Sequence, residues 1–147
     1  MAGFIPWRVI DSVLRASRTV WVSSTRPDGR PHSVPVWFLW EDGASPSIVF
    51  LSLPNTQKSR NLQDAAWVVI HTGDGDDTYI LEGTAEAIAD RAELDALNRL
   101  YMDKYVDPNS GARASFGADD TVYRVRVQHA MVWLYGNIAN RTDWYFD

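Results

Sequence analysis

A β-hairpin signal near the N-terminus constrains the fold of this chain more than any other stretch. Residues 19–25, TVWVSST, are β-branched and aromatic, a composition that favours a strand. The tetrapeptide Arg26-Pro27-Asp28-Gly29 then predicts a turn, because proline presets φ and glycine accepts a positive φ. Residues 31–40 predict the partner strand. Pro35 within it cannot donate to a ladder, so this strand needs a sheet edge or a bulge.

The predicted partner strand is mostly apolar on both faces. Strand alternation places one set of side chains together, His32, Val34, Val36, Phe38 and Trp40, and opposes it with Ser33, Pro35, Trp37 and Leu39. We therefore expect both faces of this strand to be covered.

The remaining sequence continues in short strand-like segments with few helices. Strands are predicted at 48–53, 67–71, 78–88 with a bend at Gly83, 121–135 and 141–147. Short helices are predicted at 6–16 and at 57–64, the latter with Asn55 or Thr56 as N-cap. A third is predicted to about residue 106, with Asp90 and Glu93 forming a capping-box-like start. In the last helix, one face carries Leu94, Leu97, Leu100 and Tyr101, and residues 107–120 form the longest loop. This order predicts a mainly β fold, an antiparallel barrel of six or seven strands, as one domain over residues 1–147.

Composition excludes several functional classes. The chain has 147 residues and no cysteine, which excludes disulfides, thiolate catalysis and cysteine-based zinc sites. A net charge of −5 argues against nucleic-acid binding. The longest apolar run has seven residues, so we expect no membrane span, and with no signal peptide visible we expect a cytoplasmic protein. His32, His71 and His129 lack metal-ligand spacing, so no metal site is expected.

Residues 51–62, LSLPNTQKSRNL, carry the clearest chemical signal. A strand ends, a turn follows, and a helix begins with Lys58 and Arg60 in its first turns. Helix N-termini attract phosphate, and basic residues there suggest an anion that offsets their unfavourable position. The alternative is a solvated helix with surface charges. Arg124 and Arg126 share a strand face, which fits either an anionic ligand or exposed barrel positions.

Aromatic residues and missing motifs narrow the chemistry further. Seven tryptophans and six tyrosines fit a β-rich core, and also a dimer seam or a site for a flat-ring ligand. The sequence shows no nucleophile paired with a base, so the catalytic residues stay unknown. If the chain is an enzyme, a bound cofactor supplies the difficult chemistry.

Three segments in matching order resemble the pyridoxamine 5′-phosphate oxidase-like superfamily. They are TRPDGRPHSVPVWFLWEDG, IVFLSLPNTQKSRNL and, after a further strand, DDTYILEGTAEAI. The chain is most similar to the actinobacterial flavin/deazaflavin oxidoreductases of the split β-barrel type. The resemblance covers residues 17–90 well and residues 121–147 more loosely, and the order of the segments is more specific than any single motif.

The resemblance implies an FMN-binding split-barrel homodimer with its cofactor at the subunit interface. The cofactor is the deazaflavin coenzyme F-420 or, alternatively, FMN. Its ring would be lined, largely through backbone groups, by His32, Ser33, Val34, Pro35, Val36 and Trp37. Its phosphate would be held by Leu51, Ser52, Gln57 and Lys58, with Arg60 and Asn61 nearby. Thr78 and Trp144 would approach from the other subunit.

Departures from the family pattern favour the deazaflavin and argue against pyridoxal phosphate synthesis. Trp37 stands where pyridoxamine phosphate oxidases carry a basic residue, and residues 136–141 lack their Arg-x-His. Gln57 replaces a common basic residue, leaving fewer charges for the terminal phosphate of FMN. We therefore expect a reductase that passes hydride from reduced F-420 to an unsaturated small molecule, an enone or a conjugated ring. Tyr79, His32 and water are the candidate proton donors, with water preferred.

Two alternative functions and a purely structural role remain open at this point. One alternative is an FMN-dependent reductase or oxidase on the same fold. The other is a non-catalytic barrel that binds a flavin, haem or another flat ligand. The structural role is that of a dimer without a ligand site.

Overall fold

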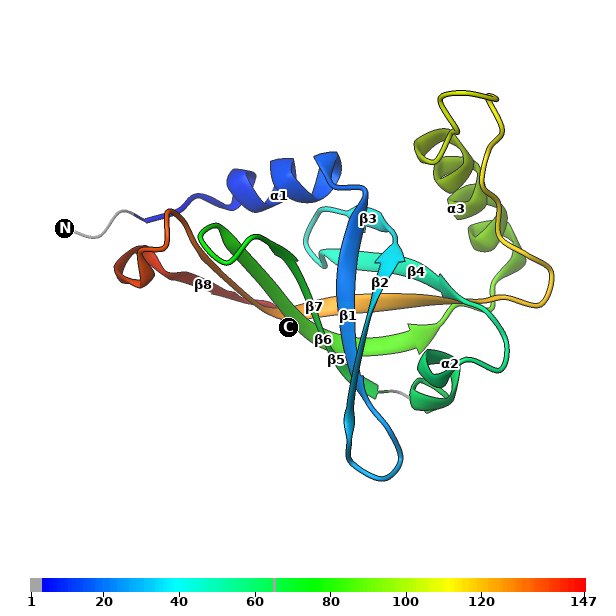
Figure 1. Ribbon diagram of the computed structural model, residues 1–147, viewed down its shortest axis with the longest axis horizontal. Helices are drawn as coiled ribbons and strands as arrows, with labels where there is room; N and C mark the ends of the chain where they lie inside the picture. The colour runs from blue at the N-terminus through cyan, green and yellow to red at the C-terminus, as the bar shows by residue number, and fades with distance from the viewer. Residues whose placement is uncertain (1–3, 65) are drawn as a thin grey trace.

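The structure, a computed structural model, describes residues 4–64 and 66–147 as one curled antiparallel sheet with helices at its ends (Figure 1). The strands are β1 (Thr19–Thr25), β2 (Pro31–Trp37), β3 (Leu39–Glu41), β4 (Ser47–Ser52), β5 (Ala66–Gly73), β6 (Thr78–Ala87), β7 (Thr121–Trp133) and β8 (Thr142–Tyr145). The helices are α1 (Trp7–Ala16), α2 (Gln57–Asn61), α3 (Arg91–Lys104) and the short 3-10 helix η1 (Ile138–Asn140). The predicted mainly β split-barrel architecture is confirmed.

The strand order explains why the sheet curls. Its order is β2-β1-β5-β6-β7-β4-β3, with β8 also pairing with β7. The two end strands, β2 and β3, are joined by the single residue Phe38. Because one residue connects opposite ends of the order, the sheet has to bend round until those ends meet. The prediction of one continuous strand over 31–40 is wrong at this point, since the chain crosses there from one sheet edge to the other.

The β1–β2 hairpin forms as predicted. Its register runs from Thr19 opposite Trp37 to Thr25 opposite Pro31. Gly29 has a φ of 90°, and its N–H donates to the carbonyl of Arg26 at 2.9 Å. Strand β2 ends the strand order, so the prediction that a proline strand lies at an edge is confirmed.

Over β2, β1, β5, β6 and the second half of β7, only one face of the sheet is buried within the chain. Cross-strand pairs align Val34, Val22, Ile70, Leu81 and Ala130 in a row that points into the core. The neighbouring row on the opposite face is only partly buried or exposed and consists of Pro35, Trp21, His71, Ile80 and Met131. We call this opposite face the outer sheet face. The expectation that both faces of the second strand are covered is therefore wrong for β2 of the isolated chain, where Ser33, Pro35 and Trp37 stay exposed. It is right for Leu39, just after β2, which is buried on the second face.

A bulge bends β6 at the predicted glycine. The register of β6 against β7 shifts between Glu82 and Gly83. A Cβ atom at Gly83 would lie 1.9 Å from the carbonyl oxygen of Arg126, so the two backbones approach too closely for a side chain. The bend is therefore fixed by the sequence at this position.

The helices cover the two ends of the sheet. Helix α1 buries Ile10 and Leu14 against the main core. Helix α3 buries Leu97 and Tyr101 in a second cluster, and Asp90 caps it by accepting from the N–H of Glu93. The predicted inward position of Leu100 is wrong, since this residue is 57% exposed. Helix α2 ends at Asn61, earlier than the predicted residue 64.

Two further observations concern membranes and metals. Over residues 4–64 and 66–147, no helix combines the length and apolarity needed to cross a bilayer. Within the same residues, no group of three or more histidine, aspartate or glutamate side chains is arranged to hold a metal ion.

Candidate functional site

The turn between β4 and α2 is built by hydroxyl side chains. Ser52, at the end of β4, is fully buried, and its hydroxyl lies 3.1 Å from the hydroxyl of Thr56. Thr56 caps α2 by accepting from the N–H of Ser59, as one of the two predicted caps. Asn55 has a φ of 63°, which lets the chain reverse before the helix. The turn therefore holds α2 against the strand end.

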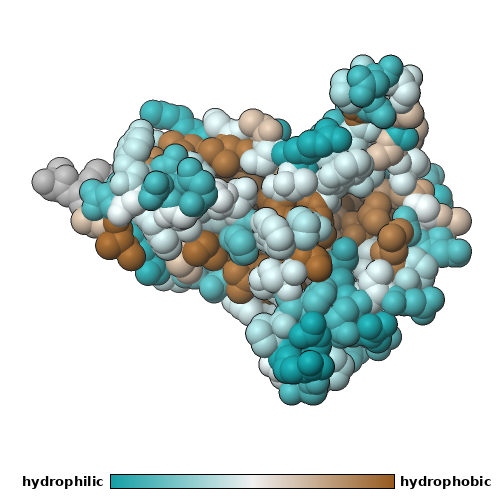
Figure 2. Space-filling model, in the orientation of Figure 1, coloured by the Kyte–Doolittle hydropathy of each residue, from teal (hydrophilic) through white to brown (hydrophobic). Residues whose placement is uncertain are grey.

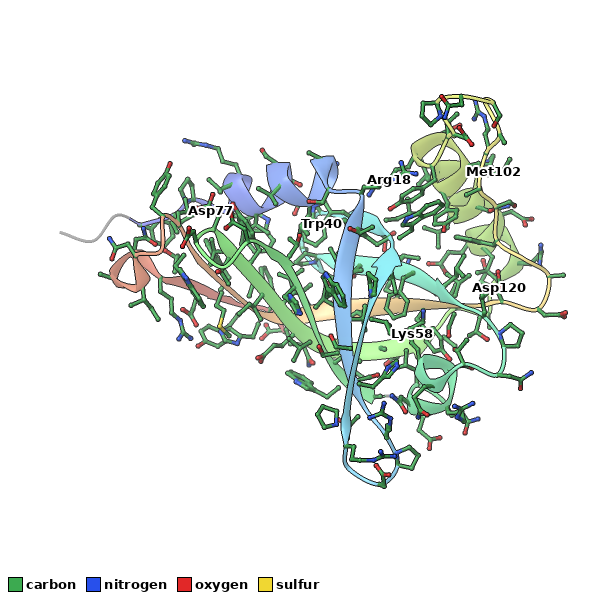
Figure 3. All side chains as sticks on the ribbon, in the orientation of Figure 1. Arg18, Trp40, Lys58, Asp77, Met102 and Asp120 are labelled. Carbon is green, nitrogen blue, oxygen red and sulfur yellow. The ribbon has the colours of Figure 1, made fainter. Side chains whose placement is uncertain are left out.

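Lys58 lies on the side of α2 that faces the sheet (Figure 3). Its Nζ is 5.8 Å from the ring centroid of the buried Phe50. Among the described residues, no carboxylate pairs with it. Burial lowers the pKa of Lys58, because its charged form has lost hydration without gaining a counter-ion. An anionic ligand would supply that counter-ion.

Asn61 connects α2 to the hairpin. Its Nδ2 donates to the hydroxyl of Ser24 on β1 at 3.0 Å. Ser24 is the register partner of His32 on β2. The Nδ1 atom of His32 is buried and has no hydrogen-bond partner within the described residues. A buried nitrogen of this kind is costly unless a ligand or water satisfies it. The structure therefore brings Lys58, Asn61 and His32 to one region, where β1, β2, β4 and α2 converge.

The other polar residues of α2 are engaged in local bonds. Arg60 donates to the carbonyl of Asn55 at 3.1 Å and to Oε1 of Gln57 at 3.0 Å. Gln57 in turn donates to Asn61 at 2.7 Å. Leu51 is partly buried against the second core cluster. Lys58 is thus the cation of α2 whose ammonium group is not used to hold the helix together.

Strand β2 splits its six predicted cofactor residues between two faces. His32, Val34 and Val36 point to the barrel interior, and Ser33, Pro35 and Trp37 are exposed on the other side. As the end strand of the order, β2 has one edge whose backbone groups are not paired with another strand. The six side chains, in contrast, do not line one surface together.

Thr78 is the first residue of β6 and Trp144 belongs to β8, and both the start of β6 and β8 lie at the end of the sheet away from α2 (Figure 1). Thr78 pairs with Trp133 on the outer sheet face. Trp144 packs on Trp7 of its own chain, with ring centroids 5.4 Å apart. Within one chain they do not approach Lys58, so their approach from a second subunit stays a prediction.

The other sequence candidates have structural partners. Arg124 forms ion pairs with Glu41 and Glu93, and Arg30 with Asp28, so these charges are already neutralised. His129 hydrogen-bonds to Asp143 at 2.8 Å and stacks on Tyr145. Burial in the core raises the pKa of Tyr79, which makes it a poor proton donor.

The packing of Tyr105 and Arg18 beside Trp37 was not predicted from the sequence. The rings of Trp37 and Tyr105 stack with centroids 4.6 Å apart and an interplanar angle of 1°. Arg18 lies beside them, with its guanidinium carbon 4.8 Å from the Trp37 centroid. Tyr105 follows α3, and nothing in its local sequence shows that it reaches residues 18 and 37.

Two pockets lie near the candidate residues, and Lys58 lines neither of them. One of about 390 Å³ lies beside Trp37 and Tyr105. The other, of about 460 Å³, lies between α2 and the β6–β7 pair, next to Leu62, Ala85 and Tyr123. Figure 2 shows apolar surface between the β1–β2 pair and α3, with hydrophilic surface at the hairpin tip.

The solved structures most informative for comparison share this fold at low identity. A conserved hypothetical protein of Mycobacterium tuberculosis is 22% identical, with a TM-score of 0.71, and the match covers 91% of this chain and 88% of that one. A protein of Clostridium acetobutylicum related to general stress protein 26 is 15% identical, with a TM-score of 0.68 and coverage of 94% and 92%. A pyridoxamine 5′-phosphate oxidase-related, FMN binding protein of Nostoc punctiforme is 12% identical, with a TM-score of 0.60 and full coverage of both chains.

Sequence comparison gives the family. The search of curated proteins finds no relative that matches this chain. The family model for pyridoxamine 5′-phosphate oxidase, in contrast, matches residues 7–134, which include every strand except β8. The chain belongs to the pyridoxamine 5′-phosphate oxidase family, whose members share the FMN-binding split-barrel fold.

Proposed function

We propose that this chain is an oxidoreductase that uses reduced coenzyme F-420 to reduce an unsaturated small molecule. The family indicates a flavin-binding oxidoreductase, and we specify the deazaflavin as its cofactor. The observation that carries it is Lys58, a half-buried cation with no acidic partner among the described residues.

The charge around Lys58 favours a phosphodiester over a terminal phosphate. A phosphate monoester carries nearly two negative charges at neutral pH, whereas a phosphodiester carries one. Arg30 is paired with Asp28, and the exposed guanidinium of Arg60 is bound to Asn55 and Gln57, so Lys58 is the cation of α2 with an unengaged, desolvated ammonium group. One desolvated ammonium group matches the single charge of the F-420 phosphodiester better than the dianion of FMN.

In this proposal, residues of the chain bind and orient the cofactor. Lys58 holds the phosphate, Asn61 fixes α2 against β1, and the unpaired His32 Nδ1 is available to a polar group of the ligand. The bound reduced cofactor supplies a hydride for an electrophilic carbon of an enone or a conjugated ring. The proton comes from water, because Tyr79 is buried and its raised pKa makes it a weak acid.

A homodimer, proposed from the family resemblance, is supported by the outer sheet face. The row of Trp21, His71, Ile80 and Met131 crosses four strands and is only partly covered within the chain. Thr78, expected to reach the cofactor of the other subunit, lies on this same face. A second copy placed here would bury apolar surface that one chain leaves open.

The test is a pair of titrations of the full-length protein with F-420 and with FMN, followed by fluorescence. Micromolar or tighter binding of F-420 with weak binding of FMN supports the proposal. The reverse preference moves the chain to FMN chemistry on the same fold. If neither binds, the proposal fails.

A turnover assay separates catalysis from storage. The loss of reduced F-420 is followed with a panel of enones and conjugated ring compounds. Oxidation that depends on both protein and acceptor supports the reductase. Tight binding without hydride transfer to any acceptor identifies a ligand-binding barrel instead.

A further inference from the structure

The pocket beside Trp37 has the components of a separate ligand site. It has a volume of about 390 Å³ and lies between the start of β1, the end of β2 and the loop after α3. Arg18, Trp37 and Tyr105 form one side, and Asp107, Pro108 and Arg113 belong to the loop side. None of these residues belongs to α2, and Trp37 is the one among them that the resemblance assigns to the cofactor ring.

One wall of the pocket is a fixed aromatic surface. Tyr105 is buried and stacks in parallel on Trp37 at 4.6 Å. The hydroxyl of Tyr105 accepts from the N–H of Phe38 at 2.8 Å and donates to the carbonyl of Arg18 at 2.7 Å. These bonds hold the ring pair in place, while Trp37 stays 39% exposed. A flat, preorganised aromatic surface of this kind suits a planar ligand.

Arg18 is the unneutralised charge of the pocket. Its guanidinium carbon lies 4.8 Å from the Trp37 centroid and 5.3 Å from the Tyr105 centroid, so it sits beside the stacked pair. Within residues 4–64 and 66–147, no carboxylate forms an ion pair with it. Arg113, in contrast, is paired with Asp103.

The acidic residue of the pocket, Asp107, is engaged in hydrogen bonds within its own turn. Asp107 accepts hydrogen bonds from the backbone N–H groups of Asn109 at 2.8 Å and Ser110 at 3.3 Å. These bonds lower the pKa of Asp107 and satisfy its carboxylate within its own turn. Behind the aromatic wall, burial together with the nearby charge of Arg18 lowers the pKa of Lys104 to about 8. Of the two guanidinium groups that line the pocket, Arg18 is thus the one without a carboxylate partner among the described residues.

We propose that this pocket binds a planar, conjugated carboxylate, with its ring against Trp37 and its carboxylate on the guanidinium of Arg18. The inference rests on the proposed function, because it assigns the pocket to the substrate and names its chemical class. The resemblance places Trp37 beside the cofactor ring, so a ligand on this wall adjoins the site of reduction. Bidentate contact with a carboxylate is the geometry for which a guanidinium is best suited.

The test is isothermal titration calorimetry of the full-length protein with 2-naphthoate and with its neutral analogue 2-naphthamide, without cofactor. We expect naphthoate to bind at least about tenfold more tightly than the amide, as a charge-assisted contact requires. Arg18→Gln should reduce naphthoate affinity to that of the amide, and Arg18→Lys should restore part of it. Arg8→Gln, at an exposed position of α1, is the matched control and should change nothing.

Each other outcome overturns the assignment. Absence of naphthoate binding, equal affinity for acid and amide, or unchanged affinity in Arg18→Gln would each do so. Because no cofactor is present, these results are independent of the F-420 and FMN titrations. A failed cofactor titration with intact naphthoate binding would reject the proposed function and leave a carboxylate site.

Discussion

The side-chain amide of Asn61 donates a hydrogen bond of 3.0 Å to the hydroxyl of Ser24, and this bond joins α2 to β1. Helix α2 has only five residues, too few to be stable by itself. Its position therefore depends on the Asn61–Ser24 bond and on the Thr56 cap. Through them, Lys58 is held close to the end of β2 that carries His32.

Loss of the Asn61 amide is expected to destabilise both the fold and the cofactor site. Ser24 is 5% exposed, so Asn61→Ala leaves a buried hydroxyl without its partner. We expect a loss of about 1–3 kcal/mol in the free energy of unfolding, measured with urea. Affinity for the cofactor should fall as well, because α2 is loosened. Gln63→Ala, at an exposed position after α2, is the control, and equal stability of both variants would refute this role.

Gly83→Ala is expected to disrupt the β6 bulge. The new Cβ would lie 1.9 Å from the carbonyl oxygen of Arg126, which belongs to the backbone of the paired strand and cannot simply move aside. We expect a loss of at least about 3 kcal/mol in unfolding free energy, or failure to fold. Thr84→Ala on the same strand should stay within about 1 kcal/mol of the wild type. A fully stable Gly83→Ala protein would show that the strands can separate here at little cost.

Asp143 is expected to contribute to stability in a pH-dependent way. Its bonds to Arg141 and His129 lower its pKa from 3.8 to about 2, against a smaller opposing effect of burial. Because the folded-state value is the lower one, this stabilisation is present above about pH 4 and is lost as the pH falls toward 2. Asp143→Asn should therefore cost about 1–2 kcal/mol at pH 7 and progressively less below pH 4. Urea unfolding at pH 7 and pH 3 checks this, and a pH-independent difference would contradict it.

A negative charge on the outer sheet face is expected to prevent dimerisation. Ile80 lies in the middle of that face, between His71 and Met131. Analytical ultracentrifugation should show a dimer for the wild type and a monomer for Ile80→Glu. Leu100→Glu, at an exposed apolar position of α3, should remain dimeric. A wild-type monomer at all concentrations would exclude a cofactor site shared between subunits.

Local sequence signals predicted most of the secondary structure. The turn at Gly29, the edge position of Pro35, the Thr56 and Asp90 caps and the bend at Gly83 are each determined by the chemistry of one or two residues. All of them are confirmed. The break at Phe38 was missed, because the apolar run continues through it and the reason for the break is the closure of the sheet.

The candidate site was predictable only where its residues are close together in the sequence. Lys58 stood out in the sequence because the turn and helix start lie next to it. Its lack of an acidic partner and the unpaired His32 nitrogen depend on which strands meet there. The Trp37–Tyr105 stack joins residues 68 positions apart in the chain, and no periodicity in the sequence connects them.

The most direct test of the account is the cofactor affinity of Lys58→Ala, measured by fluorescence titration beside the wild type. Removal of one charge-assisted contact should weaken F-420 binding about tenfold to a hundredfold. Arg91→Ala, which removes a surface charge on α3, should bind as the wild type does. Unchanged affinity in Lys58→Ala would contradict the central claim that this half-buried lysine holds the cofactor phosphate.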